Sequence, residues 1–107
     1  MENGRIVIVA YQPFAGREND LEALVRGHVD ILRQEGLATS RIPMLMRTAD
    51  NVVIEVFEWT SKEAIASAHT NTAVIKMWKA FSEVCTFVPL GQLHESANLF
   101  AEFTPFN

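Results

Sequence analysis

The stretch VVIEVFEW, residues 52–59, decides the fold of this chain because it is a strand that is apolar on both faces. Successive side chains of a strand point to opposite sides, so alternate residues share a face. One face carries Val52, Ile54 and Val56, and the other carries Val53, Phe57 and Trp59. An antiparallel strand with one solvated face alternates apolar with polar residues. The stretch therefore predicts a strand that is covered on both sides.

Two more strands are predicted upstream of this stretch. Residues 39–48 form a hairpin with it, because the intervening Ala49-Asp50-Asn51 tolerates tight-turn geometry. Pro43 inside that arm predicts a bulge or an edge strand. The β-branched residues 5–12 form a strand that ends at Pro13. Both strands repeat the two-sided pattern, as Ile6, Ile8 and Ala10 oppose Val7, Val9 and Tyr11, and Ile42, Met44 and Met46 oppose Pro43 and Leu45.

Two helices are predicted from apolar residues that recur every three to four positions. The first begins at Glu18 or Asn19 and ends at Gly36, a residue that suits the C′ position after a helix. The second begins at a capping box, residues 60–63, and bends at the polar residues 69–72. The first stripe is Leu21, Leu24, Val25, His28, Ile31 and Leu32, and the second is Val74, Met77, Trp78, Phe81, Val84 and Cys85.

With a last strand at residues 87–93, the order is strand, helix, strand, strand, helix, strand, the split βαβ arrangement of a ferredoxin-like fold. We therefore predict an α+β fold, with a four-stranded antiparallel sheet and two helices on one face. A chain of 107 residues suffices for one core but not for two, so residues 1–107 are expected to form one domain. The apolar tail, residues 96–107, is expected to be an arm that contacts a partner.

Composition argues against several classes of partner. The net charge is −4 and the nine basic residues are scattered, which argues against nucleic acid. No stretch reaches the roughly 18 apolar residues of a membrane span, and the first strand lacks the cleavage pattern of a signal peptide. Cys85 is the single cysteine, which excludes a disulfide framework. We expect a cytoplasmic protein that binds neither nucleic acid nor membrane.

Two helices cover one face of a four-stranded sheet, so the second apolar face needs another cover. Leaving about eight large apolar side chains in water forfeits on the order of 10–20 kcal/mol, compared with a net stability of roughly 5–15 kcal/mol for a typical domain. A homodimer through sheet-to-sheet packing is the simplest remedy, since two-fold dimers are the commonest oligomers. The alternative is a monomer whose tail folds back over its own sheet.

Residues 56–64, VFEWTSKEA, followed by His69 and by Trp78-Lys79-Ala80-Phe81, resemble the third strand and second helix of the antibiotic-biosynthesis-monooxygenase-like proteins. This family belongs to the dimeric α/β barrel superfamily, and its element order matches nearly the whole chain. The resemblance implies a dimeric barrel whose substrate cleft lies between the helices and the sheet of each monomer. It does not by itself assign an activity, because the family includes monooxygenases, haem-degrading enzymes and proteins that process signalling molecules.

Three residues are candidates for catalysis in such a cleft. His28 interrupts an otherwise aliphatic stripe, where a neutral imidazole can take a proton; the alternative is a core histidine bonded to a backbone carbonyl. His69 stands where many family members have histidine, or else it fixes the bend in the second helix. Tyr11 ends the first strand and is a candidate donor to an oxyanion, or a packed aromatic residue.

Other residues are candidates for substrate binding or for purely structural roles. Trp59, Trp78, Met77 and Phe81 are expected to form the walls for a flat ligand, although large residues on such stripes are usually core. Arg47 and Glu55 are expected to form an exposed pair across the hairpin. His94 lies in or just after the last strand. The three histidines lack metal-ligand spacing and no glycine-rich phosphate loop is present, so we predict neither a metal nor a cofactor.

The leading hypothesis is a cofactor-independent monooxygenase or related oxidoreductase that acts on an aromatic or polycyclic small molecule. In it, His28 or His69 is the base and Tyr11 the donor. Its rival is a non-catalytic dimeric barrel that binds a small apolar ligand, with a role in stress or signalling. Haem degradation is disfavoured, because Ala68 and Trp78 occupy the stretches where haem-degrading relatives carry tryptophan and histidine.

Overall fold

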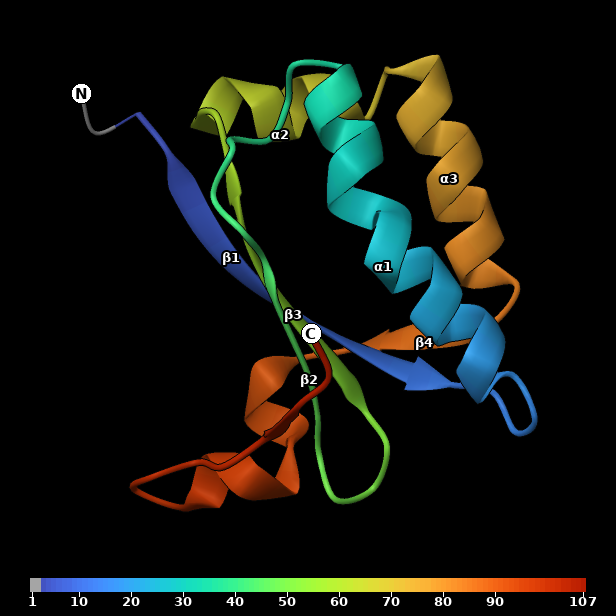
Figure 1. Ribbon diagram of the computed structural model, residues 1–107, viewed down its shortest axis with the longest axis vertical. Helices are drawn as coiled ribbons and strands as arrows, with labels where there is room; N and C mark the ends of the chain where they lie inside the picture. Colours follow the sequence, from blue (N-terminus) through green and yellow to red (C-terminus); the bar gives the residue numbers. More distant parts are fainter. Residues whose placement is uncertain (1–2) are drawn as a thin grey trace.

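The computed structural model describes residues 3–107, and its elements follow the predicted order. The strands are β1 (Arg5–Pro13), β2 (Met44–Arg47), β3 (Val53–Trp59), β4 (Cys85–Val88) and β5 (Thr104–Pro105), and the helices are α1 (Glu18–Gln34), α2 (Lys62–Ala68) and α3 (Thr72–Ser82). Two 3₁₀ turns, η1 (Leu90–Gln92) and η2 (His94–Ala97), precede β5. Neighbouring strands pair antiparallel in the order β4-β1-β3-β2-β5. Figure 1 shows the helices on one face of the sheet and the 3₁₀ turns on the other.

The described part of the chain forms five strands and three helices, whereas the sequence predicted four strands and two helices. The extra strand is β5, only two residues long, which pairs with Met46 and Arg47 at the β2 edge. The extra helix arises from the predicted polar break, which divides the second helix into α2 and α3. There the Asn71 side chain accepts a hydrogen bond from the Val74 amide and caps α3.

Three predicted boundaries were wrong. The second strand was predicted at residues 39–48, but the continuous strand is only Met44–Arg47, after Pro43, and an isolated antiparallel bridge joins Ala38 to Trp59 before it. The fourth strand spans Cys85–Val88 rather than residues 87–93, because Pro89 follows it and cannot donate to a ladder. The cap of α2 is Ser61, one residue after the Thr60 of the predicted capping box, and its hydroxyl accepts from the Ala64 amide at 3.0 Å.

The first helix is placed as predicted, and its apolar stripe faces the sheet. Gly36 follows it with φ +74°, the left-handed conformation that glycine adopts at a helix end without strain. Its buried residues are Leu21, Val25, His28, Val29 and Leu32. This stripe carries His28 into the layer between the helices and the sheet.

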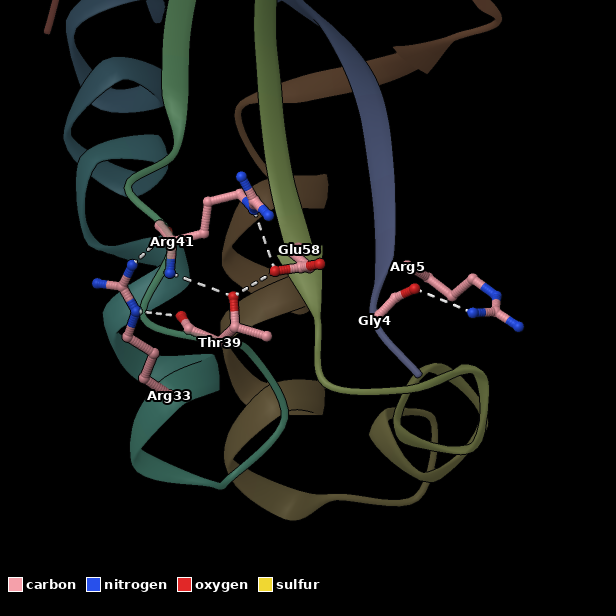
Figure 2. A network of polar contacts seen from close by, with 6 residues as sticks. All are labelled: Gly4, Arg5, Arg33, Thr39, Arg41 and Glu58. Carbon is pink, nitrogen blue, oxygen red and sulfur yellow. Dashed lines mark hydrogen bonds and ion pairs between the residues drawn. The ribbon is translucent and has the colours of Figure 1, made fainter. Parts of the chain in front are cut away.

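A polar network fixes the segment between α1 and β2 (Figure 2). One carboxylate oxygen of Glu58 accepts from the Thr39 hydroxyl at 2.9 Å and from the Arg41 guanidinium at 3.1 Å. These two hydrogen bonds lower the pKa of Glu58. Arg33 donates to the backbone carbonyls of Thr39 and Arg41, at 2.7 and 2.6 Å. The network therefore holds the segment that leads into β2 against both α1 and β3.

The two faces of the sheet are both apolar, as the alternation predicted, but they are covered differently. On the face toward the helices, here called the helix face, Tyr11, Phe57 and Leu45 belong to the main core. On the opposite face, here called the open face, a smaller cluster joins Ala10 and Ile54 to Leu93, which lies between η1 and η2. Beyond that cluster the open face leaves several side chains exposed, namely Ile6 at 56%, Ile8 at 50% and Met44 at 57%.

The tail is tied to its own sheet. The Phe106 amide donates to the Leu45 carbonyl at 2.9 Å, and the Asn107 side-chain amide donates to the Pro43 carbonyl at 2.7 Å. The Phe106 ring packs against the guanidinium groups of Arg26 and Arg47. These contacts hold the end of the chain along the β2 edge. Within residues 3–107, no helix is both long enough and apolar enough to cross a bilayer.

Candidate active site

A cavity of about 340 Å³ lies on the helix face, between the sheet and the helices α1 and α3. Its volume is within the range of small-molecule sites, roughly 300–1,000 Å³. Every strand of the sheet except β2 and β5 contributes to its wall. The lining residues are Val7, Val9, Tyr11, His28, Phe57, Trp59, Trp78 and Phe87. The cavity is therefore mainly aromatic and aliphatic, with few polar groups.

Glu55 is the unexpected residue of this region, because its side chain is fully buried on the helix face of β3. One oxygen of its carboxylate, Oε1, contacts two side chains. It accepts a hydrogen bond from the Tyr11 hydroxyl at 2.7 Å and lies 2.8 Å from Nδ1 of His28. The β1–β3 register pairs Val9 with Glu55, so Tyr11, two residues further along β1, is a diagonal neighbour of Glu55 on the same face of the sheet. His28 reaches Glu55 from the buried stripe of α1, which packs on that face.

The partners of His28 define its tautomer. Nδ1 faces the Glu55 carboxylate and therefore donates, while Nε2 lies 3.4 Å from the Trp78 indole N–H and therefore accepts. If Nε2 carried a proton, that proton would point at the indole proton of Trp78, and the hydrogen bond between them could not form. This hydrogen-bond pattern fits the tautomer that carries its proton on Nδ1 and its lone pair on Nε2, toward Trp78 of the cavity wall.

Aromatic rings fix the plane of this imidazole. The His28 ring makes edge-to-face contacts with Phe57 at 5.3 Å and with Phe81 at 5.1 Å between ring centroids. Phe81 also stacks on Tyr11 at 5.1 Å, so both partners of Glu55 share one aromatic neighbour. Such contacts leave the ring of His28 little freedom to turn away from Glu55.

Burial sets the protonation of the groups around Glu55. Desolvation, followed by the charge of Glu55 and their hydrogen bond, raises the pKa of Tyr11 well above its usual value. The hydroxyl of Tyr11 therefore keeps its single proton and donates it to Glu55. Burial also raises the pKa of the Cys85 thiol to about 11, so this cysteine is not a thiolate at neutral pH.

The second oxygen of the Glu55 carboxylate, Oε2, is buried and has no hydrogen-bond partner within residues 3–107. A buried carboxylate with one unsatisfied oxygen costs free energy that an apolar residue at this position would not. Buried titratable groups of this kind gather at functional sites more often than elsewhere. The arrangement of Glu55, His28 and Tyr11 therefore marks the cavity as the candidate site.

The predicted exposed pair between Arg47 and Glu55 was wrong. Arg47 pairs with Glu22 on α1, and Glu55 turns to Tyr11 and His28. The sequence contained the signal, because strand alternation places Glu55 on the same face as Val53 and Phe57. When a glutamate stands between two core residues on one face of a strand, its carboxylate is expected to be buried and to bond to a buried partner. That expectation outweighs an exposed pair with a residue across the hairpin.

The other predicted site residues are distributed unevenly. Trp59 and Trp78 line the cavity, whereas Met77 and Phe81 are buried in the core and are not part of its lining. His69 is exposed and its Nδ1 lies 2.9 Å from the Ile65 carbonyl, which fixes the end of α2. Its ring contacts Trp78 at 5.2 Å, so it lies behind the cavity wall.

Neither a metal cluster nor the third histidine belongs to this region. No three His, Cys, Asp or Glu side chains in the described residues come close enough to hold a metal ion. His94 lies in η2, on the open face of the sheet. The located polar groups at the cavity are therefore the imidazole of His28, the hydroxyl of Tyr11 and the indole N–H of Trp78.

Comparison with known proteins identifies the fold. No protein-family model and no curated protein sequence matches the chain. Among solved structures it is similar to SnoaB, a cofactor-independent oxygenase from Streptomyces nogalater, with a TM-score of 0.66 and 14% sequence identity. The match covers 80% of this chain and 87% of that chain. The match supports the predicted fold family. At 14% identity it is evidence for the fold and not for a shared activity.

Proposed function

We propose that the protein is a cofactor-independent monooxygenase that oxidises a flat aromatic small molecule in the cavity of the helix face. The observation that carries this proposal is the hydrogen bond from Nδ1 of His28 to the fully buried carboxylate of Glu55, which leaves Nε2 basic at an aromatic cavity. The similarity of the fold to that of a cofactor-independent oxygenase supports the same reaction class.

His28 is the proposed base. Its Nε2 takes a proton from an acidic C–H or O–H group of the substrate, and the imidazolium that results lies beside the negative charge of Glu55 at 2.8 Å. A fixed charge in a buried site stabilises the imidazolium without reorganisation of solvent. The substrate has to displace the Trp78 indole from Nε2, and a hydrogen bond as long as 3.4 Å is readily exchanged.

The proposed oxidation balances without an external reductant. A methylene next to an aromatic carbonyl loses one proton to His28 and becomes an electron-rich carbanion. The carbanion reduces dioxygen and forms a carbon–peroxide bond; the peroxide takes up a proton and eliminates water, which leaves a second carbonyl. One oxygen atom stays on the substrate and the other leaves as water. The apolar cavity contributes by excluding solvent from the carbanion.

Tyr11 and the aromatic residues take supporting roles in this proposal. Since the Tyr11 hydroxyl donates its only proton to Glu55, we assign Tyr11 to holding Glu55 rather than to binding an oxyanion. Trp59 and Trp78 are the walls for the substrate. His69 is the alternative base, although it is exposed and outside the cavity lining.

A non-catalytic ligand-binding function is the second candidate, and one observation favours it. In this structure the indole of Trp78 already occupies Nε2 of His28, and Tyr11 is committed to Glu55. If Trp78 stays in place, the cavity offers an apolar ligand a tight fit but no base. Both candidates predict ligand binding, and only the first predicts consumption of dioxygen.

Dioxygen consumption with a panel of anthrones and hydroxyquinols separates the two. We expect turnover by the wild type and a loss of about 10²–10⁴-fold in His28→Ala, the usual contribution of a general base. His69→Ala tests the alternative base, and His94→Ala is the matched control, since His94 lies on the open face. Absence of turnover, or a His28→Ala variant as active as the wild type, would reject His28 as the base.

A further inference from the structure

The aromatic cavity of the helix face has a buried end and an open side. Its buried lining residues are Tyr11, His28, Phe57 and Trp59. The other four are Val7, Val9 and Trp78, which are half-buried, and Phe87, which is 57% exposed. These four residues, here called the mouth, come from β1, α3 and β4. A ligand therefore enters along this side, and any side chain that the ligand carries leaves the cavity there.

The edge of β1 beside the mouth is not paired with another strand. β4 pairs only with residues 10–13 of β1, because Pro89 follows Val88 and cannot continue the ladder. Figure 1 shows the first half of β1 extending beyond β4. Residues 6–9 therefore have β3 on one side and, within the described chain, no strand on the other. This stretch contains Val7 and Val9 of the mouth.

The strand register shows which backbone groups point toward this unpaired edge. Alternate residues of a strand bond to its two neighbours, so even-numbered and odd-numbered residues of β1 face opposite edges. The Phe14 amide donates to the Val84 carbonyl at 2.8 Å, so the even-numbered residues face the β4 side. The N–H and C=O of Ile8 therefore point out of the sheet, between Val7 and Val9. No backbone hydrogen bond among residues 3–107 reaches them there.

The hydrogen-bonding groups at the buried end of the cavity are, by contrast, already engaged. The Tyr11 hydroxyl donates to Glu55, and the His28 imidazole lies between Glu55 and the Trp78 indole. A polar substituent of a ligand has to displace one of these bonds at the buried end. At the mouth it has to displace only water from the backbone of Ile8. The mouth is therefore where a polar substituent gains a hydrogen bond.

The backbone of Ile8 also defines which substituent fits. The N–H and C=O of one extended residue point to the same side, so Ile8 presents a donor and an acceptor together. A primary carboxamide is complementary, because its carbonyl oxygen accepts and the neighbouring N–H donates in the same direction. A carboxylate has acceptors alone, and it would face the Ile8 carbonyl without a proton to share. The edge of β1 therefore favours a carboxamide over a carboxylate.

We infer that the aromatic ligand of this cavity carries a carboxamide on a short side chain, and that the carboxamide bonds to the N–H and C=O of Ile8. The ring occupies the cavity and the side chain leaves through the mouth. Pairing with a free strand edge is a known mode of peptide recognition, and here a single amide uses it. The inference deepens the proposed function by naming aromatic carboxamides as the substrate class, and it rests on that function only for the location of the ring.

Calorimetric titration with two probes tests the inference. The probe 2-naphthylacetamide has two fused rings and a carboxamide, and 2-isobutylnaphthalene has the same shape without polar atoms. An apolar cavity of about 150 Å³ binds benzene, so the cavity of about 340 Å³ has room for two fused rings. Ile8→Pro removes the N–H, which no strand uses, and Ile8→Ala is the matched control that keeps it. We expect the preference for the carboxamide to be about fivefold smaller in Ile8→Pro than in Ile8→Ala, the effect of one neutral hydrogen bond.

Hydrogen exchange provides a second measurement that needs no variant, so that a misfolded Ile8→Pro does not end the test. The Ile8 amide is expected to exchange rapidly in the free protein and about fivefold more slowly when the protein is saturated with 2-naphthylacetamide. Saturation with 2-isobutylnaphthalene is expected to leave its exchange rate unchanged. The Val9 amide, which faces β3, is the reference for a protected amide. An Ile8 amide as protected as that of Val9 in the free protein would overturn the inference.

The outcomes separate this inference from the proposed oxygenase. Equal carboxamide preferences in Ile8→Pro and Ile8→Ala would overturn the inference even if the protein consumes dioxygen. A preference that depends on the Ile8 N–H, without any consumption of dioxygen, would support the inference and reject the oxygenase. A lower sedimentation mass for Ile8→Pro at an unchanged carboxamide preference would assign the edge to another protein strand, and this result too would overturn the inference.

Discussion

The two faces of one sheet carry cavities of similar volume, about 340 Å³ on the helix face and about 310 Å³ on the open face, yet their chemistry differs. The first has a histidine whose proton is held by a buried carboxylate. The second has one hydroxyl, already bonded to the backbone. Volume alone therefore does not distinguish a reaction site from a packing site. The convergence of polar groups does.

The difference between the faces begins with neighbouring residues of β3. Ile54 faces the tail and Glu55 faces the helices, because alternate side chains of a strand point to opposite sides. Glu58 lies on the same face as Ile54, and its carboxylate bonds to the half-buried Thr39 and the exposed Arg41 rather than to fully buried groups. Two glutamates three residues apart thus lie on opposite faces of the sheet in different environments. Replacing each of them is therefore the sharpest test of the difference between the two faces.

The largest expected effect on stability is that of Glu55→Ala. Removal of Glu55 leaves two buried donors without an acceptor, the Tyr11 hydroxyl and Nδ1–H of His28, and each unsatisfied buried donor costs about 1–3 kcal/mol. Glu58→Ala is the control, and its effect is expected to be much smaller, because its partner Arg41 is largely exposed. Urea unfolding measures both. Equal losses in the two variants would contradict the burial of Glu55.

The next effect is a loss of stability at alkaline pH that comes from the helix face. Cys85 and Tyr11 have raised folded-state pKa values, so the stability they contribute is complete below their ordinary values, 9.0 and 10.0, and is lost as the pH rises through the folded values. Urea midpoints measured from neutral pH to pH 11 should therefore fall above pH 9. In Cys85→Ala the early part of this fall, between pH 9.0 and about 11, should be reduced. An unchanged slope would show that the thiol is not buried.

The smallest expected effect concerns the indole of Trp78. Trp78→Phe keeps an aromatic wall but removes the N–H that bonds to Nε2 of His28. One neutral hydrogen bond is worth about 1 kcal/mol, so we expect the affinity for an aromatic ligand to rise by roughly fivefold, because the ligand no longer competes for Nε2. Trp59→Phe is the control in the same cavity. Isothermal titration calorimetry measures the ligand affinity of both variants. Equal changes in affinity would show that the Trp78 indole does not compete with the ligand for Nε2 of His28.

The sequence predicted the framework of the site better than its chemistry. The apolar stripe that contains His28, the bend between α2 and α3, and the two-sided pattern of β3 are all present in the structure. These features follow from periodicity, which a single sequence displays. The partner of His28 was missed, because Glu55 was assigned to Arg47 across the hairpin.

The path of the tail was also beyond the reach of local patterns. A strand of two residues, Thr104–Pro105, leaves no periodic signal, and the position of Phe106 depends on two arginines from distant elements. The apolar composition predicted an arm that contacts a partner, and the alternative was a tail that folds back over its own sheet. Neither predicted that the end of the tail bonds to its own β2 edge while Leu99 and Phe100 remain exposed.

The central claim is that Glu55 holds the proton of His28 on Nδ1 and leaves Nε2 as the base at the cavity. Nitrogen-15 NMR of the imidazole, at mildly alkaline pH and without any substrate, tests it directly. The account predicts that the resonance of His28 shows a protonated Nδ1 and a bare Nε2. A His28 imidazole that carries its proton on Nε2 would contradict it, since that nitrogen would then have no lone pair with which to take a proton.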